Sequence, residues 1–308
     1  MLRRDWLRAA AAGAAAAGGL ARGADDLPAT RPFPTSGERV PVVGMGTWLT
    51  FHVAVQDADA MARRRAVLAR FLDAGGTLID SSPMYSSAEQ VLGELLPGLV
   101  AARPARHVFC ATKVWTPLGA LGPSQMQRSL ALWRRPAADL MQVHNLLNWR
   151  EHLKTLRAWK EQGRARLIGV TTSHGNKHDE MERVLRAEGA ALDAMQITCN
   201  PADRRAEPLM RRAADLGLAV IVNRPFDGGS VLDRLRDRPL PGVARELGCT
   251  AWAPAVLKWQ LADPAVTCVI PATSDPEHMA ENLQALRGPL PDGRQRAELA
   301  AAIERGLA

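Results

Sequence analysis

The sequence predicts a single (β/α)8 barrel, and three observations lead to that prediction. Short apolar runs typical of β-strands alternate eight times with longer stretches at helical spacing. Strict alternation favours a parallel sheet, and eight repeats favour closure into a barrel. The alternative, an open doubly wound sheet, normally carries a Gly-x-Gly-x-x-Gly turn after its first strand. Here that strand ends in Gly44-Met45-Gly46-Thr47-Trp48, without a third glycine or an immediate helix.

The elements follow in order along the 308 residues, a length that one barrel domain accommodates. The expected strands are 40–47, 77–81, 107–114, 139–145, 166–172, 194–199, 219–224 and 266–272. The expected helices between and after them are 58–74, 87–100, 123–134, 149–162, 177–187, 203–216 and 276–287. Two further helical pieces, at about 230–247 and 252–262, lie between strands seven and eight. The amphipathic stretch 293–305 predicts a last helix that covers the barrel.

The N-terminus has the composition of an export signal. A charged start is followed by a run of mostly alanine and glycine that ends in small residues. The pair Arg3 and Arg4, followed by Trp6, resembles a twin-arginine signal, which implies export of the folded protein. The apolar run is shorter than the roughly 20 residues that span a bilayer, so we expect no stable membrane insertion. A disordered extension rich in arginine and alanine is the alternative.

These features predict the domain organisation and the location. We expect a twin-arginine-like signal peptide at 1–23, a linker at 24–37 and the barrel at 38–308. The expected partner is the twin-arginine export machinery. The chain would then fold with its cofactor in the cytoplasm and act in the periplasm or another extracytoplasmic space.

Charge and cysteine content exclude several classes of function. The formal net charge is +7, and residues 1–23 carry three of these charges. No basic run with interleaved aromatic residues is present, so nucleic-acid binding is not expected. The four cysteines form no Cys-x-x-Cys pair, which argues against a zinc site and a disulfide framework.

Side chains that can transfer or position a proton follow three neighbouring strands. Asp80 ends the second strand, and Tyr85, the only tyrosine of the chain, follows in the loop. Lys113 ends the third strand and His144 the fourth. Catalytic groups of a barrel come from the C-terminal ends of its strands, so these four should meet at one mouth. Taken singly, Asp80 is typical of a helix cap, Lys113 of a solvated strand end and His144 of a hydrogen-bonded core residue. The combination of all four residues predicts a catalytic site.

This grouping suits the reduction of a carbonyl. A hydride that reaches the carbonyl carbon leaves charge on the oxygen, and an acid must deliver a proton there. Tyrosine, with a pKa of about 10, is a weak acid at neutral pH, but a nearby cation lowers that pKa. We therefore expect Lys113, held by Asp80, to depress the pKa of Tyr85. His144 would donate a hydrogen bond to the substrate oxygen. The chemistry requires no metal, and the sequence suggests no metal site.

In order and spacing, Asp80, Tyr85, Lys113 and His144 resemble the catalytic tetrad of the aldo/keto reductases. The resemblance extends from about residue 38 to 287, and four segments carry it besides the tetrad: 71–80, 93–96, 163–170 and 276–283. It implies an NAD(P)H-dependent reductase of aldehydes or ketones, with a small carbonyl compound as substrate. It also implies a cofactor that lies extended across the barrel mouth.

The resemblance further implies which residues bind the cofactor. The residues that match the contacts of the nicotinamide amide are Thr171, Thr172 and Gln196. Those that match positions near the nicotinamide ribose are Thr47 and Trp48. Those around the adenosine end are Thr273, His278, Glu281 and Asn282. The remaining residues expected at the cofactor are Asp80, Asn223, Arg224, Pro225 and Phe226.

Some positions depart from the family pattern. Asn223 stands where the family usually has an aromatic residue that stacks on the nicotinamide, and an amide cannot stack. Ala272 and His278 stand where basic residues often contact the 2′-phosphate, which weakens the preference for NADPH over NADH. Arg224 is an additional cation at the mouth that could bind phosphate instead. We therefore expect NADPH as cofactor, with NADH possible.

Two other functions remain open from the sequence. The barrel could serve as a nucleotide-binding sensor or regulatory module with little turnover. Alternatively, Lys113 could form a Schiff base in a lyase or isomerase.

Overall fold

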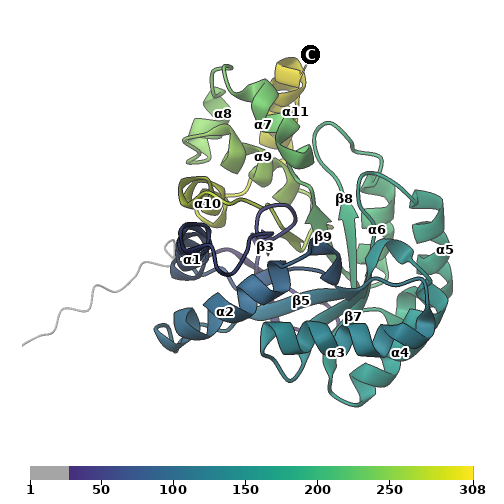
Figure 1. Cartoon of the computed structure of the whole chain (residues 1–308). Coiled ribbons are helices and arrows are strands. Elements are labelled where there is room, and N and C mark those ends of the chain that lie inside the picture. Colours follow the sequence, from purple (N-terminus) through teal and green to yellow (C-terminus); the bar gives the residue numbers. More distant parts are fainter. Residues whose placement is uncertain (1–27, 308) are drawn as a thin grey trace, which may run out of the picture.

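A computed structural model describes residues 28–307, and its centre is a ring of eight parallel strands (Figure 1). The strands are, in chain order, β3 (Met45–Gly46), β4 (Leu78–Asp80), β5 (Phe109–Val114), β6 (Ala138–Val143), β7 (Ala165–Thr171), β8 (Ala194–Thr198), β9 (Ala219–Asn223) and β10 (Cys268–Val269). Each strand pairs in parallel with the next. Parallel bridges from Val43 to Val269 and from Gly46 to Ala272 join the first strand to the last. The predicted (β/α)8 barrel is confirmed.

Helices surround the barrel and cover its outer face (Figure 1). Those that follow the first six strands are α1 (Ala58–Asp73), α2 (Ala88–Ala101), α3 (Gly122–Trp133), α4 (Trp149–Glu161), α5 (His178–Glu188) and α6 (Glu207–Asp215). Between β9 and β10 lie α7 (Ser230–Leu235), α8 (Gly242–Glu246) and α9 (Trp252–Leu261). After β10 come α10 (Pro276–Leu283) and α11 (Gly293–Leu307). Every stretch predicted as helix contains a helix.

A β-hairpin lies at the start of the described chain, where the sequence predicted a linker at 24–37. β1 (Thr30–Pro32) pairs antiparallel with β2 (Arg39–Pro41). Phe33, in the turn between them, is fully buried and stacks on Phe109 of β5 with ring centres 5.3 Å apart. Part of the expected linker therefore covers the N-terminal end of the barrel interior.

Two barrel strands are shorter than the sequence suggested. The first was expected at 40–47, but residues 39–41 pair with β1, and only Met45–Gly46 joins the barrel. The eighth was expected at 266–272, but only Cys268–Val269 is a strand. The hairpin with β1 takes residues 39–41 from the first strand. The eighth strand ends before Pro271, which has no N–H group to donate to a ladder.

The interior of the barrel changes character along its axis. Toward the N-terminal ends of the strands it is filled by apolar side chains, among them Leu78, Phe109 and Ile221. Toward the C-terminal ends it is polar, with Asp80, Lys113 and Gln196 all buried. Since buried polar groups cost free energy unless they are paired, this end needs a dense hydrogen-bond network.

All four cysteines are buried and unpaired. Burial raises the pKa of Cys199 and Cys268 to about 12, so these thiols are protonated at neutral pH and act as small apolar side chains. Within residues 28–307, no three side chains of the metal-ligating types lie together in a group that could hold an ion.

The expected signal peptide, 1–23, and residues 24–27 of the expected linker lie outside the described part of the chain. Among the helices of residues 28–307, none combines the length and apolar character that a membrane span requires.

Candidate active site

A cavity of about 970 Å³ opens at the C-terminal mouth of the barrel. Its floor is formed by Asp80 of β4, Thr171 of β7, Gln196 of β8 and Asn223 of β9, and its walls by the loops that follow the strands. Helices α7 and α10 and the start of α9 extend it to one side of the barrel. The cavity is therefore elongated and reaches from the barrel axis to the α10 side.

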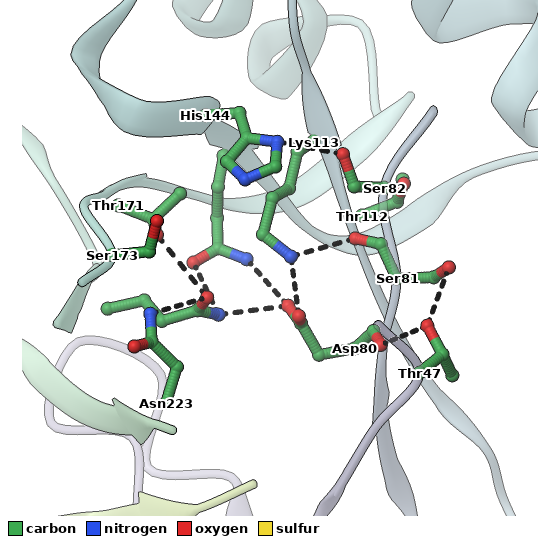
Figure 2. A network of polar contacts seen from close by, with 12 residues as sticks. Thr47, Asp80, Ser81, Ser82, Thr112, Lys113, His144, Thr171, Ser173 and Asn223 are labelled. Carbon is green, nitrogen blue, oxygen red and sulfur yellow. Dashed lines mark hydrogen bonds and ion pairs between the residues drawn. The ribbon is translucent and has the colours of Figure 1, made fainter. Parts of the chain in front are cut away.

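A buried ion pair lies beneath one wall of this cavity. Lys113, which is fully buried, pairs with the Oδ2 atom of Asp80 and donates to the carbonyl oxygen of Ser81 at 2.8 Å (Figure 2). The Lys113 ammonium also lies 5.1 Å from the centre of the Tyr85 ring. Burial opposes the charged lysine, but Asp80 and Tyr85 outweigh it and raise the pKa of Lys113. The lysine thus stays cationic behind the phenol.

Two amides hold the other carboxylate oxygen of Asp80. Gln196 of β8 donates to Oδ1 at 2.9 Å, and Gln142 of β6 donates to it at 3.2 Å. Both oxygens of the carboxylate are therefore occupied, which fixes the position of Lys113.

His144 is held in one orientation by Ser82. The Oγ atom of Ser82 lies 2.8 Å from Nδ1 of His144 and accepts a hydrogen bond from the backbone N–H of Met84. Its own hydrogen can be donated to Nδ1, and in that arrangement the ring proton of a neutral imidazole lies on Nε2. Burial, assisted by Lys113, lowers the pKa of His144 to about 2. At neutral pH His144 is thus an uncharged imidazole that lines the cavity.

The pKa of Tyr85 differs in direction from the prediction. The Tyr85 ring is edge-on to His144, with centres 5.6 Å apart. Burial raises the pKa of Tyr85 above its ordinary value, although Lys113 lowers it. The expected depression was wrong because desolvation of the phenolate outweighs the cation. The phenol consequently keeps its proton at neutral pH, as a proton donor must.

A row of polar side chains crosses the cavity floor from β7 to β9. Thr171 and Asn223 each contact the Oε1 atom of Gln196 at 3.3 Å. Asn223 also donates to the carbonyl oxygen of Thr172 at 2.8 Å and accepts from Thr198 at 2.5 Å. Asn223, which stands where the family usually has an aromatic residue, is therefore held in the cavity floor by hydrogen bonds. Its side chain is a polar amide and gives the nicotinamide no ring to stack on.

Loops from β3, β7 and β9 meet over the centre of the cavity. Trp48 contacts His174 edge to face, with ring centres 5.2 Å apart, and the Arg224 guanidinium lies 5.2 Å from the Trp48 ring. Arg224 also pairs with Asp227 at 3.1 Å. Its Nε atom is buried and has no hydrogen-bond partner within residues 28–307. A ligand with acceptor oxygens at this point would satisfy that atom.

The side of the cavity that faces α10 is the expected adenosine end. Thr273, His278 and Glu281 line it, and Asn282 is buried there. Asp275 caps α10 by accepting from the backbone N–H groups of residues 277 and 278. Ala272, which also lines the cavity, leaves this end without the cation that the family pattern would supply.

The structure brings the predicted residues together along one cavity. Every residue expected at the cofactor lines it, as do Asp80, Tyr85 and His144, whereas Lys113 lies just behind the wall. Their roles toward a ligand remain predictions.

Sequence reasoning missed Ser82, which orients His144, and Gln142, which holds Asp80. A signal for both was present, because each is a polar residue at or beside the end of an apolar strand. It also missed the segment 228–240 before α8, part of which lines the cavity.

The chain is similar to known proteins over most of its length. A model of the aldo/keto reductase family matches residues 42–301. Aldo-keto reductase family 1 member A1 from Gallus gallus is 23% identical over 283 residues, which cover 81% of this chain and 81% of that protein. The corresponding protein from Pongo abelii is 24% identical over 283 residues, with 81% and 82% coverage.

Solved structures agree in fold. An aldo-keto reductase from Bacillus halodurans, in its holo form, superposes with a TM-score of 0.72 at 20% identity, over 89% of this chain and 96% of that one. An aldo/keto reductase from Klebsiella pneumoniae, in complex with NADP and acetate, gives a TM-score of 0.70 at 24% identity, over 86% and 92%. At these identities the likeness concerns the architecture.

Proposed function

Since this chain belongs to the aldo/keto reductase family, we propose that it is an oxidoreductase that uses NAD(P)H to reduce aldehydes or ketones to alcohols. One observation carries the proposal: a protonated Tyr85 and a neutral His144 stand edge to face on one cavity wall, with the Lys113 ammonium behind the phenol. A carbonyl oxygen that gains charge needs two donors of this kind.

The cavity suits a dinucleotide. It is elongated, its floor offers the amides of Gln196 and Asn223, and the unpartnered Nε atom of Arg224 lies where a phosphate could accept. The relative from Klebsiella pneumoniae was solved with NADP, and one from Bombyx mori with NADPH. These observations support NADPH as cofactor, held by the residues named for it above.

The residues of this chain would divide the reaction as follows. When bound, the reduced nicotinamide supplies a hydride to the carbonyl carbon. His144 donates from Nε2 to the carbonyl oxygen and orients it. Tyr85 donates the proton of its hydroxyl to the same oxygen, and Lys113 stabilises the phenolate that remains. Asp80 positions Lys113.

Oxidation of NADPH in the presence of a panel of aldehydes and ketones tests the proposal. We expect carbonyl-dependent loss of NADPH absorbance, together with quenching of tryptophan fluorescence when the cofactor binds beside Trp48. Tight NADPH binding without turnover on any carbonyl would contradict the proposal and favour a regulatory module. Trapping of a substrate adduct on Lys113 by borohydride would favour Schiff-base chemistry.

We propose that the protein discriminates weakly between NADPH and NADH, because Ala272 and His278 supply no fixed cation at the adenosine end. The double change Ala272→Lys and His278→Arg should raise the preference for NADPH severalfold, since an exposed ion pair contributes about 0.2–1 kcal/mol. The measurement is the ratio of kcat/KM for the two cofactors. A wild type already strongly selective for NADPH, with no gain in the variant, would show that other residues bind the 2′-phosphate.

We also propose that residues 1–23 direct export by the twin-arginine machinery, and that the protein acts in the periplasm or another extracytoplasmic space. The support is the sequence Arg3-Arg4 ahead of a short, weakly apolar run. Changing both arginines to lysine should leave the precursor in the cytoplasm, as cell fractionation would measure. Equal export of the variant and the wild type would disprove the twin-arginine assignment.

A further inference from the structure

We propose that Glu89 is a positioning residue for the reaction, which fixes Tyr85 against the strand that carries Lys113. The inference rests on the proposed reductase function and adds to it a residue that does not line the cavity. Glu89 lies in the first turn of α2, four residues after Tyr85, and is 1% exposed. Its partner in β5 is Thr112, the neighbour of Lys113. A contact between Glu89 and Thr112 therefore connects the two segments that supply the phenol and the ammonium.

The carboxyl group of Glu89 is held by three donors from two neighbouring elements. The Thr112 hydroxyl donates to Oε1, and the indole N–H of Trp133 donates to the same oxygen at 3.2 Å. The Ser129 hydroxyl donates to Oε2 at 2.8 Å. Trp133 and Ser129 belong to α3, whereas Thr112 belongs to β5. Of the three hydrogen bonds, the one from Thr112 therefore ties α2 to the barrel, and the other two tie it to the neighbouring helix.

The segment that carries Tyr85 contacts strand β5 on both of its faces. Neighbouring side chains of a strand point to opposite faces, so Lys113 points to the barrel axis and Thr112 to the helix layer. On the inner face, the Lys113 ammonium lies 5.1 Å from the centre of the Tyr85 ring. On the outer face, Thr112 donates to Glu89, a few residues further along the same segment. A displacement of the start of α2 relative to β5 would disturb both contacts together.

Hydrogen bonds join this segment to β5 on each side of Tyr85. Before Tyr85, the backbone N–H of Ser81 donates to the carbonyl oxygen of Ala111 at 2.9 Å. After Tyr85, the carboxyl group of Glu89 accepts from Thr112. Because a loop fixed at one end only can still move at the other, the second bond is what holds the ring at a set distance from the ammonium.

The packing of α2 on α3 has a second support, which is independent of Glu89. Gly93 lies one turn after Glu89, on the same face of α2. A Cβ atom at Gly93 would lie only 1.8 Å from the carbonyl oxygen of Leu132, near the end of α3, so the two helices are in backbone contact there. The bond from Ser129 thus adds to an interface that is already closely packed, and its loss should not displace α2 from β5.

A carboxyl group is a costly side chain for this buried place. Burial raises the pKa of Glu89, although its three hydrogen bonds and Lys113 lower it. Well-packed apolar side chains often give equal or greater stability where a charged group is buried. Stability alone therefore does not account for Glu89. A hydrogen bond to Thr112 does, because it has a preferred distance and direction, whereas an apolar contact has neither.

The test compares two variants that each remove one hydroxyl from the carboxyl group of Glu89. Thr112→Val removes the bond to β5, and Ser129→Ala, the matched control, removes a bond to α3. With the carbonyl that the wild type reduces fastest, Thr112→Val should lower kcat by about 10–100-fold and leave KM for NADPH nearly unchanged, since a misplacement of about 1 Å can cost about 10²-fold. Ser129→Ala should keep the wild-type kcat, as should Thr112→Ser, which retains the hydroxyl. Thr112→Ala removes the same bond and replaces Thr112→Val if that variant does not fold.

The ultraviolet difference spectrum of the Tyr85 phenolate reports the position of the ring without any turnover, and it decides the test. A loosened ring loses burial, the largest cause of its raised pKa, so the phenolate of Thr112→Val should form at lower pH, closer to the ordinary pKa of about 10. Ser129→Ala should match the wild type. Such a shift supports the inference even if no carbonyl is reduced, and in that case only the reductase function fails. A phenolate that forms in Thr112→Val at the same pH as in the wild type, or in Ser129→Ala, overturns the inference and leaves the reductase function intact.

Discussion

Replacement of Tyr85 by phenylalanine is expected to lower kcat/KM by about 10²–10⁴-fold, the usual contribution of a general acid. The change removes one hydroxyl and keeps the ring that packs against His144. Cofactor affinity, measured by fluorescence titration, should therefore change little. Retention of more than a tenth of wild-type activity would show that another group delivers the proton.

Because Tyr85 is the only tyrosine, the ultraviolet difference spectrum of its phenolate reports this residue alone. We expect the phenolate to form above the ordinary pKa of about 10, since burial outweighs the lysine. In Lys113→Met the step should move higher still, because the cation that favours the phenolate is gone. Circular dichroism at each pH confirms that the protein stays folded, and Tyr85→Phe gives the blank. A step at or below the ordinary value that does not respond to Lys113 would refute the assignment.

The change Lys113→Met should both inactivate and destabilise the protein. It leaves the Asp80 carboxylate buried with two amide donors and no counterion. Loss of one partner of a buried ion pair typically costs about 3–5 kcal/mol, and the two amides place the expected loss near the lower value. Urea unfolding measures it, with the folded fraction checked before any assay.

A double variant separates the loss of stability caused by the unpaired Asp80 charge from the loss of catalysis. Asp80→Asn combined with Lys113→Met removes both charges and keeps a polar group for the two amides. It should recover much of the lost stability, because no unpaired charge remains, but it should not recover turnover. If Lys113→Met had the same free energy of unfolding as wild type, the Lys113–Asp80 pair would be solvated, and leaving Asp80 without its counterion would cost no stability.

The barrel could be predicted because it rests on local patterns. Eight apolar runs with helical stretches between them specify the fold, and strand ends specify the mouth, so Asp80, Lys113 and His144 were found from position alone. The limits of β3 and β10 were missed because pairing partners decide them. The hairpin around Phe33 takes residues from the first strand, a competition that no short window of sequence reveals.

The rest of the site depends on long-range packing. The direction of the Tyr85 pKa follows from how deeply the ring is buried, which no spacing encodes. Gln142 faces the barrel axis and contacts a residue 62 positions earlier in the chain. In the wall before α8, Trp252 at the start of α9 donates to the carbonyl oxygen of Arg238, a contact between residues 14 positions apart in the chain.

The hairpin of β1 and β2 has a kinetic consequence. Phe33 and the apolar filling behind it cover the N-terminal end of the barrel in the described chain, so the cavity opens to solvent at the mouth. The polar floor from Thr171 to Asn223 is buried, whereas the side chain of Trp48 is partly exposed. A molecule bound at the floor must enter before one bound above it and leave after it. We therefore expect compulsory-order kinetics, with the nucleotide first on and last off.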